Sequence, residues 1–360
     1  MKRCSIAQGV SSWVMGDRCW VMGDRFWVLG DRCWVMYVRV IKFFIFHLSF
    51  FISLASCSPT PPPPTTSSSS SLTILFTGDV LLDRGVRHTA EHRGIGYLFE
   101  EVTPIFREAD AVVVNLECPL TDTISPVNKK YIFRGDARWG KDLRSVGITH
   151  AAMANNHTND QGRRGLQATA HHLTDAGITP LGYGNNFKEQ MSPVLIEKDG
   201  ISVALFNATT LTIENWCRLD DKPGIAQPTE DELLDEIDNF RSKYPDTHIV
   251  VVLHWGVEFQ SYPTIRQRAF AHRLSEAGVS AIIGHHPHVL QPIDTIGKMP
   301  VYYSIGNFVF DQKNPKSRES MIARLTFHGN GTLSADSISI RIEQGRPMIR
   351  KSPATTSNTE

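Results

Sequence analysis

Short runs of Val, Ile and Leu alternate with amphipathic helical segments over most of this chain, and this alternation constrains the fold more than any other feature. The runs are continuous instead of alternating with polar residues, which is typical of strands buried on both faces of a sheet. They occupy residues 72–79, 110–117, 201–210, 248–256, 279–286 and 300–307. Helical periodicity fills segments 162–177, 229–244 and 263–278. The pattern predicts an α/β domain.

The ends of the predicted helices carry recognisable signals. Thr229 and Glu232 have the spacing of a capping box. The third helix is expected to start on Pro263 and to stop at Gly278, which is the usual asymmetry of helix ends. Beyond the last apolar run, the Gly-Asn-Gly sequence at 329–331 predicts the turn of a closing antiparallel hairpin.

Polar side chains able to hold a metal ion follow four of the apolar runs and a fifth predicted strand, which precedes Asn155. They are Asp79, Asn115, Glu117, Asn155, Asn156, His157, His254, His285, His286 and His288. Because the carboxyl ends of strands in an open α/β sheet converge on one crevice, we expect these side chains to meet at a single sheet edge. Carboxylate, amide and imidazole ligands without cysteine indicate a mixed oxygen–nitrogen site and argue against a closed structural zinc site. The sequence therefore predicts one or two divalent ions, with Mn, Fe and Zn equally compatible.

Six motifs then occur in a characteristic order. They are GDVLLDR, NLECPLT, NNHTNDQG, HWGVEF, GHHPHVLQP and SIGNFVFDQ. In this order the chain resembles the CapA-like family of capsule and poly-γ-glutamate biosynthesis, which is similar to the calcineurin-like metallophosphoesterases. The resemblance spans almost the whole globular part. It implies a four-layer α/β sandwich of two mixed sheets flanked by helices, with a metal centre between the strand ends.

Carried over by motif, the resemblance implies a set of metal ligands and one acid. The implied ligands are Asp79, Glu117, Asn156, His254, His286 and His288. His157 is implied to be the acid beside the metals, and a role in orienting water stays open. His285 is expected to pack or bond outside the ligand set. Leu81 stands where the wider phosphoesterase pattern has a histidine, and Glu117 stands for its bridging aspartate, so both positions bear on whether a second ion binds.

Other charged residues near these motifs allow two interpretations each. Arg84 is a candidate catalytic residue that would meet an anionic substrate group with a bidentate fork, or else forms a surface salt bridge. Lys129, Lys130 and Arg134 would line an approach for a carboxylate polymer, or form a solvated face. Asn307 and Asp311 would support the ligands or close the rim of the site. Cys118 is expected to be a buried small hydrophobe, with a disulfide to Cys217 as the alternative.

The N-terminal part divides into three segments. A seven-residue repeat such as WVMGDRC fills most of residues 1–35, and we interpret it as lying outside the true reading start. Residues 36–57 have the charged, apolar and small-residue regions of a secretory signal peptide, and they end in LASC, which looks like a bacterial lipobox. The Pro- and Ser-rich residues 58–71 are expected to be an extended linker. The globular domain is assigned to 72–345 and a polar tail to 346–360.

These features predict an extracytoplasmic protein held at a membrane by a lipid anchor. The 37 basic and 37 acidic residues balance, so no global field attracts nucleic acid. The first hypothesis is a metal-dependent hydrolase or transfer factor acting on poly-γ-glutamate or a related envelope polymer. The alternatives are an extracytoplasmic metallophosphoesterase and a non-catalytic subunit of a membrane polymer synthase.

Overall fold

The computed structural model describes residues 11–15, 18–22, 70–214 and 216–350, and the chain divides into two units, Met1–Thr65 and Thr66–Glu360. In the first unit, β1 (Ser11–Met15) and β2 (Arg18–Met22) pair antiparallel within the repeat. The predicted signal peptide and all but the last two residues of the predicted linker lie outside the described residues. Within the described part, no helix is long and apolar enough to span a bilayer.

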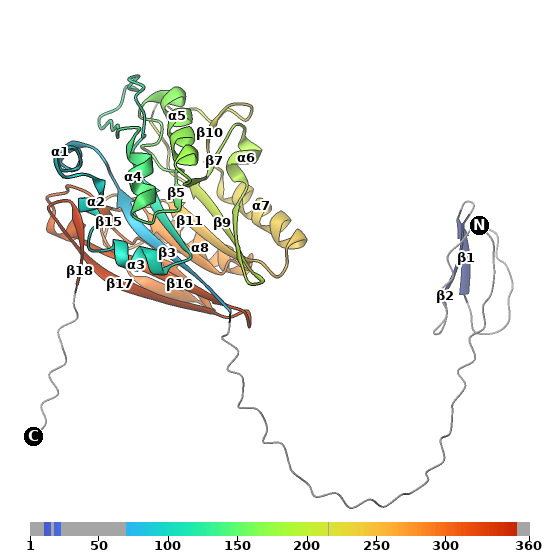
Figure 1. The fold of residues 1–360 in the computed structure, drawn as a ribbon. Coiled ribbons are helices and arrows are strands. Elements are labelled where there is room, and N and C mark those ends of the chain that lie inside the picture. Colours follow the sequence, from blue (N-terminus) through green and yellow to red (C-terminus); the bar gives the residue numbers. More distant parts are fainter. Residues whose placement is uncertain (1–10, 16–17, 23–69, 215, 351–360) are drawn as a thin grey trace, which may run out of the picture. The chain divides into compact units, whose positions relative to one another are not determined.

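The second unit is an α/β domain built on two large mixed sheets (Figure 1). In the eight-stranded sheet the order is β18-β17-β16-β3-β4-β5-β6, with β15 paired to the end of β3. Strands β3 to β6 are parallel, whereas β16, β17 and β18 add to the edge of β3 as an antiparallel meander. The bounds are β3 Ser71–Val80, β4 Ala111–Leu116, β5 His150–Ala152, β6 Thr179–Leu181, β15 Asn307–Val309, β16 Glu319–His328, β17 Leu333–Glu343 and β18 Arg346–Ile349.

The six-stranded sheet has the order β13-β14-β12-β11-β9-β8. Its four central strands are parallel, and β8 and β13 are antiparallel at the two edges. The bounds are β8 Val194–Lys198, β9 Ile201–Thr209, β11 His248–His254, β12 Ala281–His285, β13 Ile293–Ile296 and β14 Met299–Tyr302. A separate two-stranded pair joins β7 (Tyr183–Gly184) to β10 (Gly224–Ile225).

Helices cover the outer faces of the sandwich (Figure 1). They are α1 Arg84–Arg93, α2 Ile95–Leu98, α3 Thr103–Glu108, α4 Trp139–Ser145, α5 Gly162–Asp175, α6 Phe187–Met191, α7 Glu230–Lys243, α8 Ile265–Glu276 and the short 3₁₀ helix Pro315–Arg318. The Thr229–Glu232 capping box of α7 is present as predicted. Helix α8 begins at Ile265, two residues later than predicted, because Thr264 caps it through a second capping box with Gln267.

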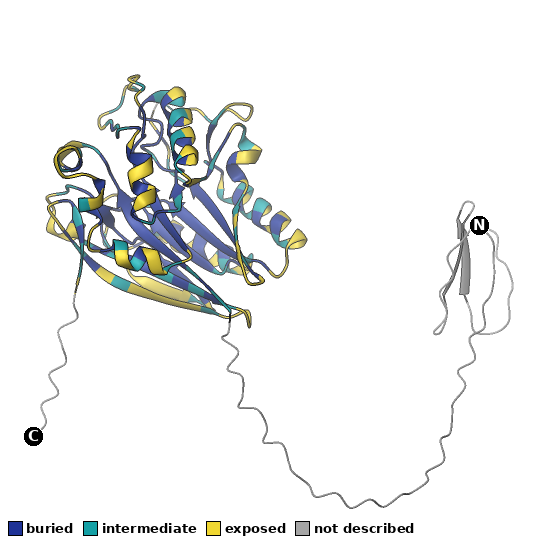
Figure 2. Ribbon diagram, viewed as in Figure 1, coloured by how far each residue is buried: buried dark blue, intermediate teal, exposed yellow. Residues whose placement is uncertain are grey.

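Alternating side chains place the core in layers. Along β3, Ile74 and Phe76 belong to the core between the two sheets, whereas Leu75 belongs to the core under the helices. On the six-stranded sheet, the ring of Phe206 meets that of Phe240 on α7 at a centroid distance of 5.7 Å. The buried strands lie in the interior, and exposed residues lie on the outer faces of the helices and along β17 (Figure 2). The predicted four-layer sandwich of two mixed sheets is therefore observed.

The C-terminal hairpin also forms as predicted, because β16 pairs with β17 around the turn at 329–331. The sheet continues past the predicted boundary at residue 345, since β18 pairs with β17 from Arg346 to Ile349. The short strand β6 is absent from the sequence prediction, and β5 was inferred only as the strand that precedes Asn155. Each has only three residues, so neither produces a periodicity that a sequence pattern could register.

Candidate metal centre

The predicted ligands come together from two sheets and not from one. Asp79 and Glu117 lie at the ends of β3 and β4 in the eight-stranded sheet, and His254 ends β11 in the six-stranded sheet. His254 Nε2 lies 3.8 Å from Glu117 Oε1. The expectation that all the ligands lie at the edge of a single sheet was therefore wrong, because they come from two sheets. The two sheets pack face to face, so their carboxyl edges adjoin and form one crevice.

Distances within the cluster are short. His288 Nε2 lies 3.6 Å from Glu117 Oε1, and His288 Nδ1 lies 3.1 Å from Asp79 Oδ2. His254 Nε2 lies 2.9 Å from Asn156 Oδ1. The rings of His254 and His286 are 4.9 Å apart between centroids. All six predicted ligands thus lie in one cluster, and candidate donor atoms of Glu117, His286 and His288 all fall within 4.8 Å of one another.

Two glycines let the backbone pass close beneath this cluster. A Cβ on Gly78 would lie 2.1 Å from the carbonyl oxygen of Gly306, and a Cβ on Gly284 would lie 2.1 Å from that of Tyr303. The segment between Tyr303 and Gly306 is also hydrogen-bonded to both sheets, through Asp79 N to Gly306 O and Ile305 N to Gly284 O. Only glycine tolerates such approach. Through these two hydrogen bonds, the segment connects β3 to β12 next to the predicted ligand Asp79.

Backbone strain is concentrated around the cluster. Among the described residues, six that are not glycine have positive φ, and four of these surround the site. His286 has φ of 97° and His288 has φ of 56°, while Arg84 and Phe259 on the rim have 54° and 61°. Such conformations cost of order 1–3 kcal/mol each and persist where surrounding structure enforces them. The two strained histidines present their rings to the crevice on either side of Pro287.

Several buried polar atoms of the cluster have no hydrogen-bond partner. Both carboxylate oxygens of Glu117 and the Nδ1 atom of His286 are in this state, although each residue is buried. An unpaired buried carboxylate is strongly unfavourable unless an ion neutralises it. Oxygen and imidazole donors with this geometry are the ligands of divalent transition ions. The residues present therefore fit a divalent metal.

Electrostatics within the cluster lead to the same conclusion. Burial raises the pKa of Glu117 well above its usual value, and the nearby Asp79 carboxylate raises it further. Burial would lower the pKa of His288, but the charges of Glu117 and Asp79 outweigh it and raise that pKa to about 10. Burial and then His288 lower the pKa of His286 to about 3, and burial followed by the neighbouring imidazoles lowers that of His254 strongly. Two of the histidines are therefore neutral and ready to bind a cation.

Asparagine side chains hold the ligands in place. Asn115 Nδ2 donates to Asp79 Oδ1 at 2.8 Å and lies 3.4 Å from His254 Nδ1, so it links the two sheets. Asn155 Oδ1 accepts from the backbone N–H groups of His157 and Thr158, at 3.0 and 3.1 Å. Asn155 thereby fixes the loop that carries Asn156 and His157. Sequence reasoning placed Asn115 and Asn155 at strand ends but assigned neither a role.

Asn307 is the partner of His288. Its Oδ1 lies 2.8 Å from His288 Nδ1, and its Nδ2 donates to the carbonyl of Ser317 at 3.1 Å. The Nδ1–H group of His288 donates to the Asn307 amide oxygen. The other ring nitrogen, Nε2, therefore faces Glu117. The predicted supporting role of Asn307 therefore matches its position, because such contacts orient a ligating imidazole.

His157 lies beside the cluster in a buried hydrogen-bonded group that sequence reasoning did not identify. Its Nδ1 lies 2.8 Å from Asp160 Oδ2, and Lys129 Nζ lies 2.7 Å from the other oxygen of Asp160. Lys129 also donates to the carbonyl of Asn156 at 2.6 Å. Asp160 stands three residues after His157 in the same NNHTND motif, and that spacing was the available signal.

Arg84 lies on the rim of a pocket of about 180 Å³ that reaches His157 and His288. Its guanidinium forms an ion pair with Asp311 and lies 5.2 Å and 5.3 Å from the ring centroids of Phe133 and Phe310. The ion pair is the salt-bridge alternative predicted for Arg84, and its contact with an anionic substrate group stays a prediction. Lys129 and Lys130 line a second pocket of about 300 Å³ beside Asn156 and His286. Arg134 instead donates to the carbonyl of Thr121 and supports the loop.

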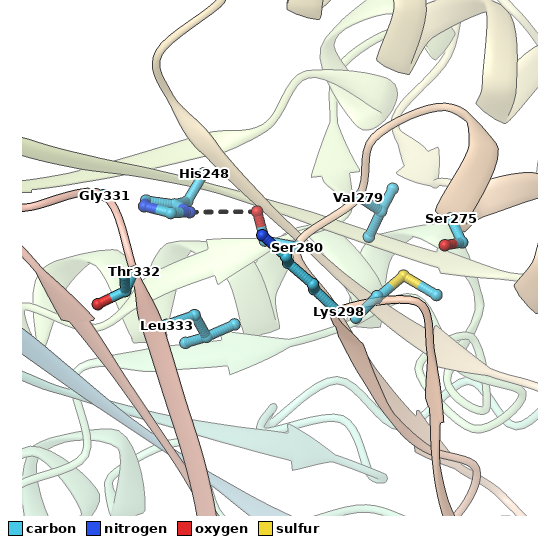
Figure 3. A pocket seen from close by; sticks show the side chains of 9 residues that line it. His248, Ser275, Val279, Ser280, Lys298, Gly331, Thr332 and Leu333 are labelled. Atoms are coloured by element: carbon cyan, nitrogen blue, oxygen red, sulfur yellow. Dashed lines mark hydrogen bonds between the residues drawn. The ribbon is translucent and has the colours of Figure 1, made fainter.

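A larger cavity lies away from the cluster. It measures about 680 Å³, and His248 at the start of β11 lines it, whereas His254 at the end of β11 belongs to the cluster. Figure 3 shows His248 pointing to Ser280, with Nδ1 and Oγ 3.2 Å apart, and Lys298 nearby. None of the residues lining this cavity carries a carboxylate. Size alone therefore does not identify the chemical site.

Four other residues singled out in the sequence have clear positions. His285 Nε2 donates to the carbonyl of Thr77 at 2.9 Å, so it joins β12 to β3 outside the ligand set, as expected. Leu81 is fully buried in the hydrophobic core under the helices. Cys118 is buried and Cys217 is exposed, and both are free thiols, so the alternative of a disulfide between them is not observed.

Comparisons with known proteins agree with these motifs. Residues 73–312 match the family of the bacterial capsule synthesis protein PGA_cap. The capsule biosynthesis protein CapA of Bacillus anthracis is 31% identical over 282 residues, which cover 77% of this chain and 69% of that protein. The PGA biosynthesis protein CapA of Bacillus subtilis is 30% identical over 279 residues, which cover 77% and 73% of the two chains.

Among solved structures, the NAD nucleotidase of Haemophilus influenzae superposes with a TM-score of 0.43 at 13% identity, covering 79% of this chain and 61% of that one. The family assignment rests on the sequence matches, which extend over both sheets and include every residue of the cluster. The chain belongs to the bacterial capsule synthesis protein family PGA_cap.

Proposed function

We propose that this protein is a metal-dependent hydrolase or transfer factor that acts on poly-γ-glutamate or a related anionic envelope polymer. The observation that carries the proposal is the buried Glu117 carboxylate, which has no hydrogen-bond partner yet lies among His254, His286 and His288. The family and the printed names of its Bacillus members support a role in making such a polymer. Arg84 and Lys130 stand at the pockets on either side of the cluster, where carboxylates of the polymer would bind.

A divalent ion held by the six ligands would supply Lewis-acid polarisation of a substrate oxygen and would activate water. The chain itself supplies proton transfer. Asp160 accepts the Nδ1 proton of His157, so Nε2 is the ring atom left to exchange a proton with the substrate. Burial lowers the pKa of His157, although Asp160 partly offsets this, so the ring is neutral near pH 7. His157 must therefore take up a proton before it acts as the acid for a leaving group.

We further propose that the domain works outside the cytoplasm, anchored by a lipid on Cys57. The support is the LASC sequence preceded by an apolar run and two basic residues. Lipid labelling of cells that express the full chain is expected to mark this protein, and a Cys57→Ser variant is expected to lose the label. Label that persists in that variant contradicts the anchor.

Activity is tested on the full chain in mild detergent, loaded with Mn²⁺ or Zn²⁺ and incubated with poly-γ-glutamate. The expected result is the appearance of new amino ends, and loss of at least ~10²-fold in rate for His157→Gln, in line with the usual contribution of a general acid. Glu197→Gln, an exposed carboxylate on the edge strand β8, is the matched control and is expected to behave as wild type.

Other outcomes separate the alternatives. A protein that binds metal but turns over no polymer alone, and activates a synthase in membranes, is the non-catalytic subunit. Turnover of aryl phosphates that His254→Ala abolishes, with none of the polymer, identifies a phosphoesterase. A chain that retains no divalent ion after dialysis contradicts all forms of the metal proposal.

A further inference from the structure

Three pockets lie end to end across the metal centre. The pocket at Arg84 and the pocket at Lys130 share Tyr131, His157 and Glu258 as lining residues. The pocket at Lys130 in turn shares Leu211 and Thr212 with a third pocket at the beginning of α8. His288 lines the first pocket and His286 lines the second, so the ligands stand between the two. We call the three pockets together the track.

The dimensions of the track suit a narrow chain. The three pockets measure about 180, 300 and 320 Å³. Sites for compact small molecules usually enclose roughly 300–1,000 Å³ in a single cavity. Each pocket here falls below or at the lower end of that range. A linear molecule that occupies all of them in sequence uses the available space better than a compact one.

The far pocket of the track has features of an anion site. It lies at the N-terminus of α8, where backbone N–H groups and the helix dipole favour negative charge. Gln267 lines it and is only 4% exposed, and its Nε2 has no hydrogen-bond partner because the capping box uses only its Oε1. Arg266, whose side chain is 75% exposed, lines the same pocket and is paired with Glu230. A carboxylate here would give Gln267 Nε2 its missing acceptor.

Each pocket of the track is lined by charges of both signs, which fits a polyamide with side carboxylates. The pairs are Arg84 with Glu258 in the first pocket, Lys129 and Lys130 with Glu214 and Glu258 in the middle one, and Arg266 with Glu230 in the third. A γ-glutamyl chain presents both carboxylates, which bind the cations, and amide N–H groups, which donate to the glutamates. A polyphosphate has no N–H donors and would meet only repulsion from Glu214 and Glu258.

We infer that the track binds a γ-glutamyl chain lengthwise, with residues of the chain on both sides of the metal centre and a carboxylate held at the α8 N-terminus. This inference rests on the proposed function and adds that the protein engages the interior of the polymer and not its end. The far pocket, with Arg266 and Gln267, is then a binding site separate from the ligands.

Binding is measured on the Mn²⁺-loaded full chain with γ-linked glutamate oligomers graded from dimer to dodecamer. Affinity is expected to rise with length until the track is filled and then to level off. Arg266→Ala is expected to weaken binding of the longest oligomer by about three- to fivefold, which is the range of an exposed ion pair. The same variant should leave the dimer unaffected, because a dimer bound at the metal centre does not reach α8.

Lys298→Ala is the matched control, since it removes one positive charge from the cavity at the opposite end of the sheet (Figure 3). It is expected to change no oligomer affinity. Length-independent binding, or equal effects of Arg266→Ala on the dimer and the dodecamer, overturns the lengthwise track and leaves the proposed function intact. Failure of every oligomer to bind overturns the proposed function itself.

Discussion

The two large sheets contribute different chemistry to the same crevice. The eight-stranded sheet and its loops supply oxygen donors, namely Asp79, Glu117 and Asn156, whereas the six-stranded sheet supplies the imidazoles of His254, His286 and His288. Neither edge alone offers the mixed donor set that a divalent transition ion prefers. The metal centre therefore depends on the packing of one sheet against the other, and on Asn115 and His285, whose side chains connect them.

The largest expected effect comes from loosening the contact between the sheets. Phe76 is fully buried in the core between them, and Phe76→Ala is expected to lower the free energy of unfolding by about 3–5 kcal/mol. Metal affinity should fall with it, because the two donor sets are no longer held together. Denaturant unfolding and metal titration measure both. Leu195→Ala on the exposed edge strand is the control, and unchanged metal affinity in Phe76→Ala would show that the edges are positioned independently of this core.

The next largest effect comes from removing the central oxygen donor. At a metal concentration 100 times the dissociation constant, bound metal is expected to raise the free energy of unfolding of the wild type by about 2.7 kcal/mol. Glu117→Gln should lose most of this gain, because the amide no longer neutralises the ion. Thermal unfolding with and without Mn²⁺ measures the gain, and Glu197→Gln should keep it. A Glu117→Gln protein that still gains the full amount would place the ion elsewhere.

The number of protons released when the metal binds tests the charges that the carboxylates of one sheet and the imidazoles of the other carry. Although burial opposes it, the charges of Glu117 and Asp79 raise the pKa of His288 to about 10, so near pH 7 this imidazole carries a proton that an ion must displace. Metal affinity is therefore expected to increase with pH, by ~1.4 kcal/mol per pH unit for each proton released. Calorimetry in buffers of different ionisation enthalpy counts these protons. Metal affinity that does not change across the neutral range, from about pH 6 to about pH 8, would contradict the ion pairs of His288 with Asp79 and Glu117.

The same pKa shift sets the stability of the metal-free protein. Because the folded pKa of His288 lies above its unfolded value of 6.5, its contribution is complete below about pH 6.5 and is lost as pH rises towards 10. Asp79 has a lowered pKa, so its contribution is present above its unfolded value and is lost as pH falls through the folded one. The metal-free protein is thus expected to lose stability in alkaline buffer, while the loaded protein does not.

The smallest effect concerns the choice of ion. Asn156→Ala removes an oxygen donor, and His286→Ala removes a nitrogen donor. The first is expected to weaken Mn²⁺ more than Zn²⁺, and the second to do the reverse, each by a factor on the order of a few-fold, because oxygen ligands suit Mn²⁺ and imidazole suits Zn²⁺. Competition titrations give both ratios. Equal losses of affinity for Mn²⁺ and Zn²⁺ in both variants would show that the division of oxygen and nitrogen donors between the two edges does not decide which ion is preferred.

Much of the fold follows from local patterns. Continuous apolar runs predict β3, β4, β9, β11 and β12, and the capping box at Thr229 predicts the start of α7. Apolar runs could not find the short strands β5 and β6, since three residues are paired only because a neighbouring strand is already in place, and β5 was inferred only from the polar residues that follow it. The role of Asn155 was equally hidden, because a hydrogen bond to a backbone loop leaves no periodic signal, whereas Asp160 left only its spacing from His157.

The amino-acid sequence by itself determined which chemical groups were present and that each would stand at the end of a strand, because apolar runs and their polar ends are local properties. Only the tertiary structure decided that the groups come from two facing sheets, that Asn115 joins them and that Asp160 orients His157. Sheet-to-sheet packing is a long-range contact. Its geometry depends on residues far apart in the chain, such as Gly78 and Gly306, whose backbones approach closely only once both sheets have formed.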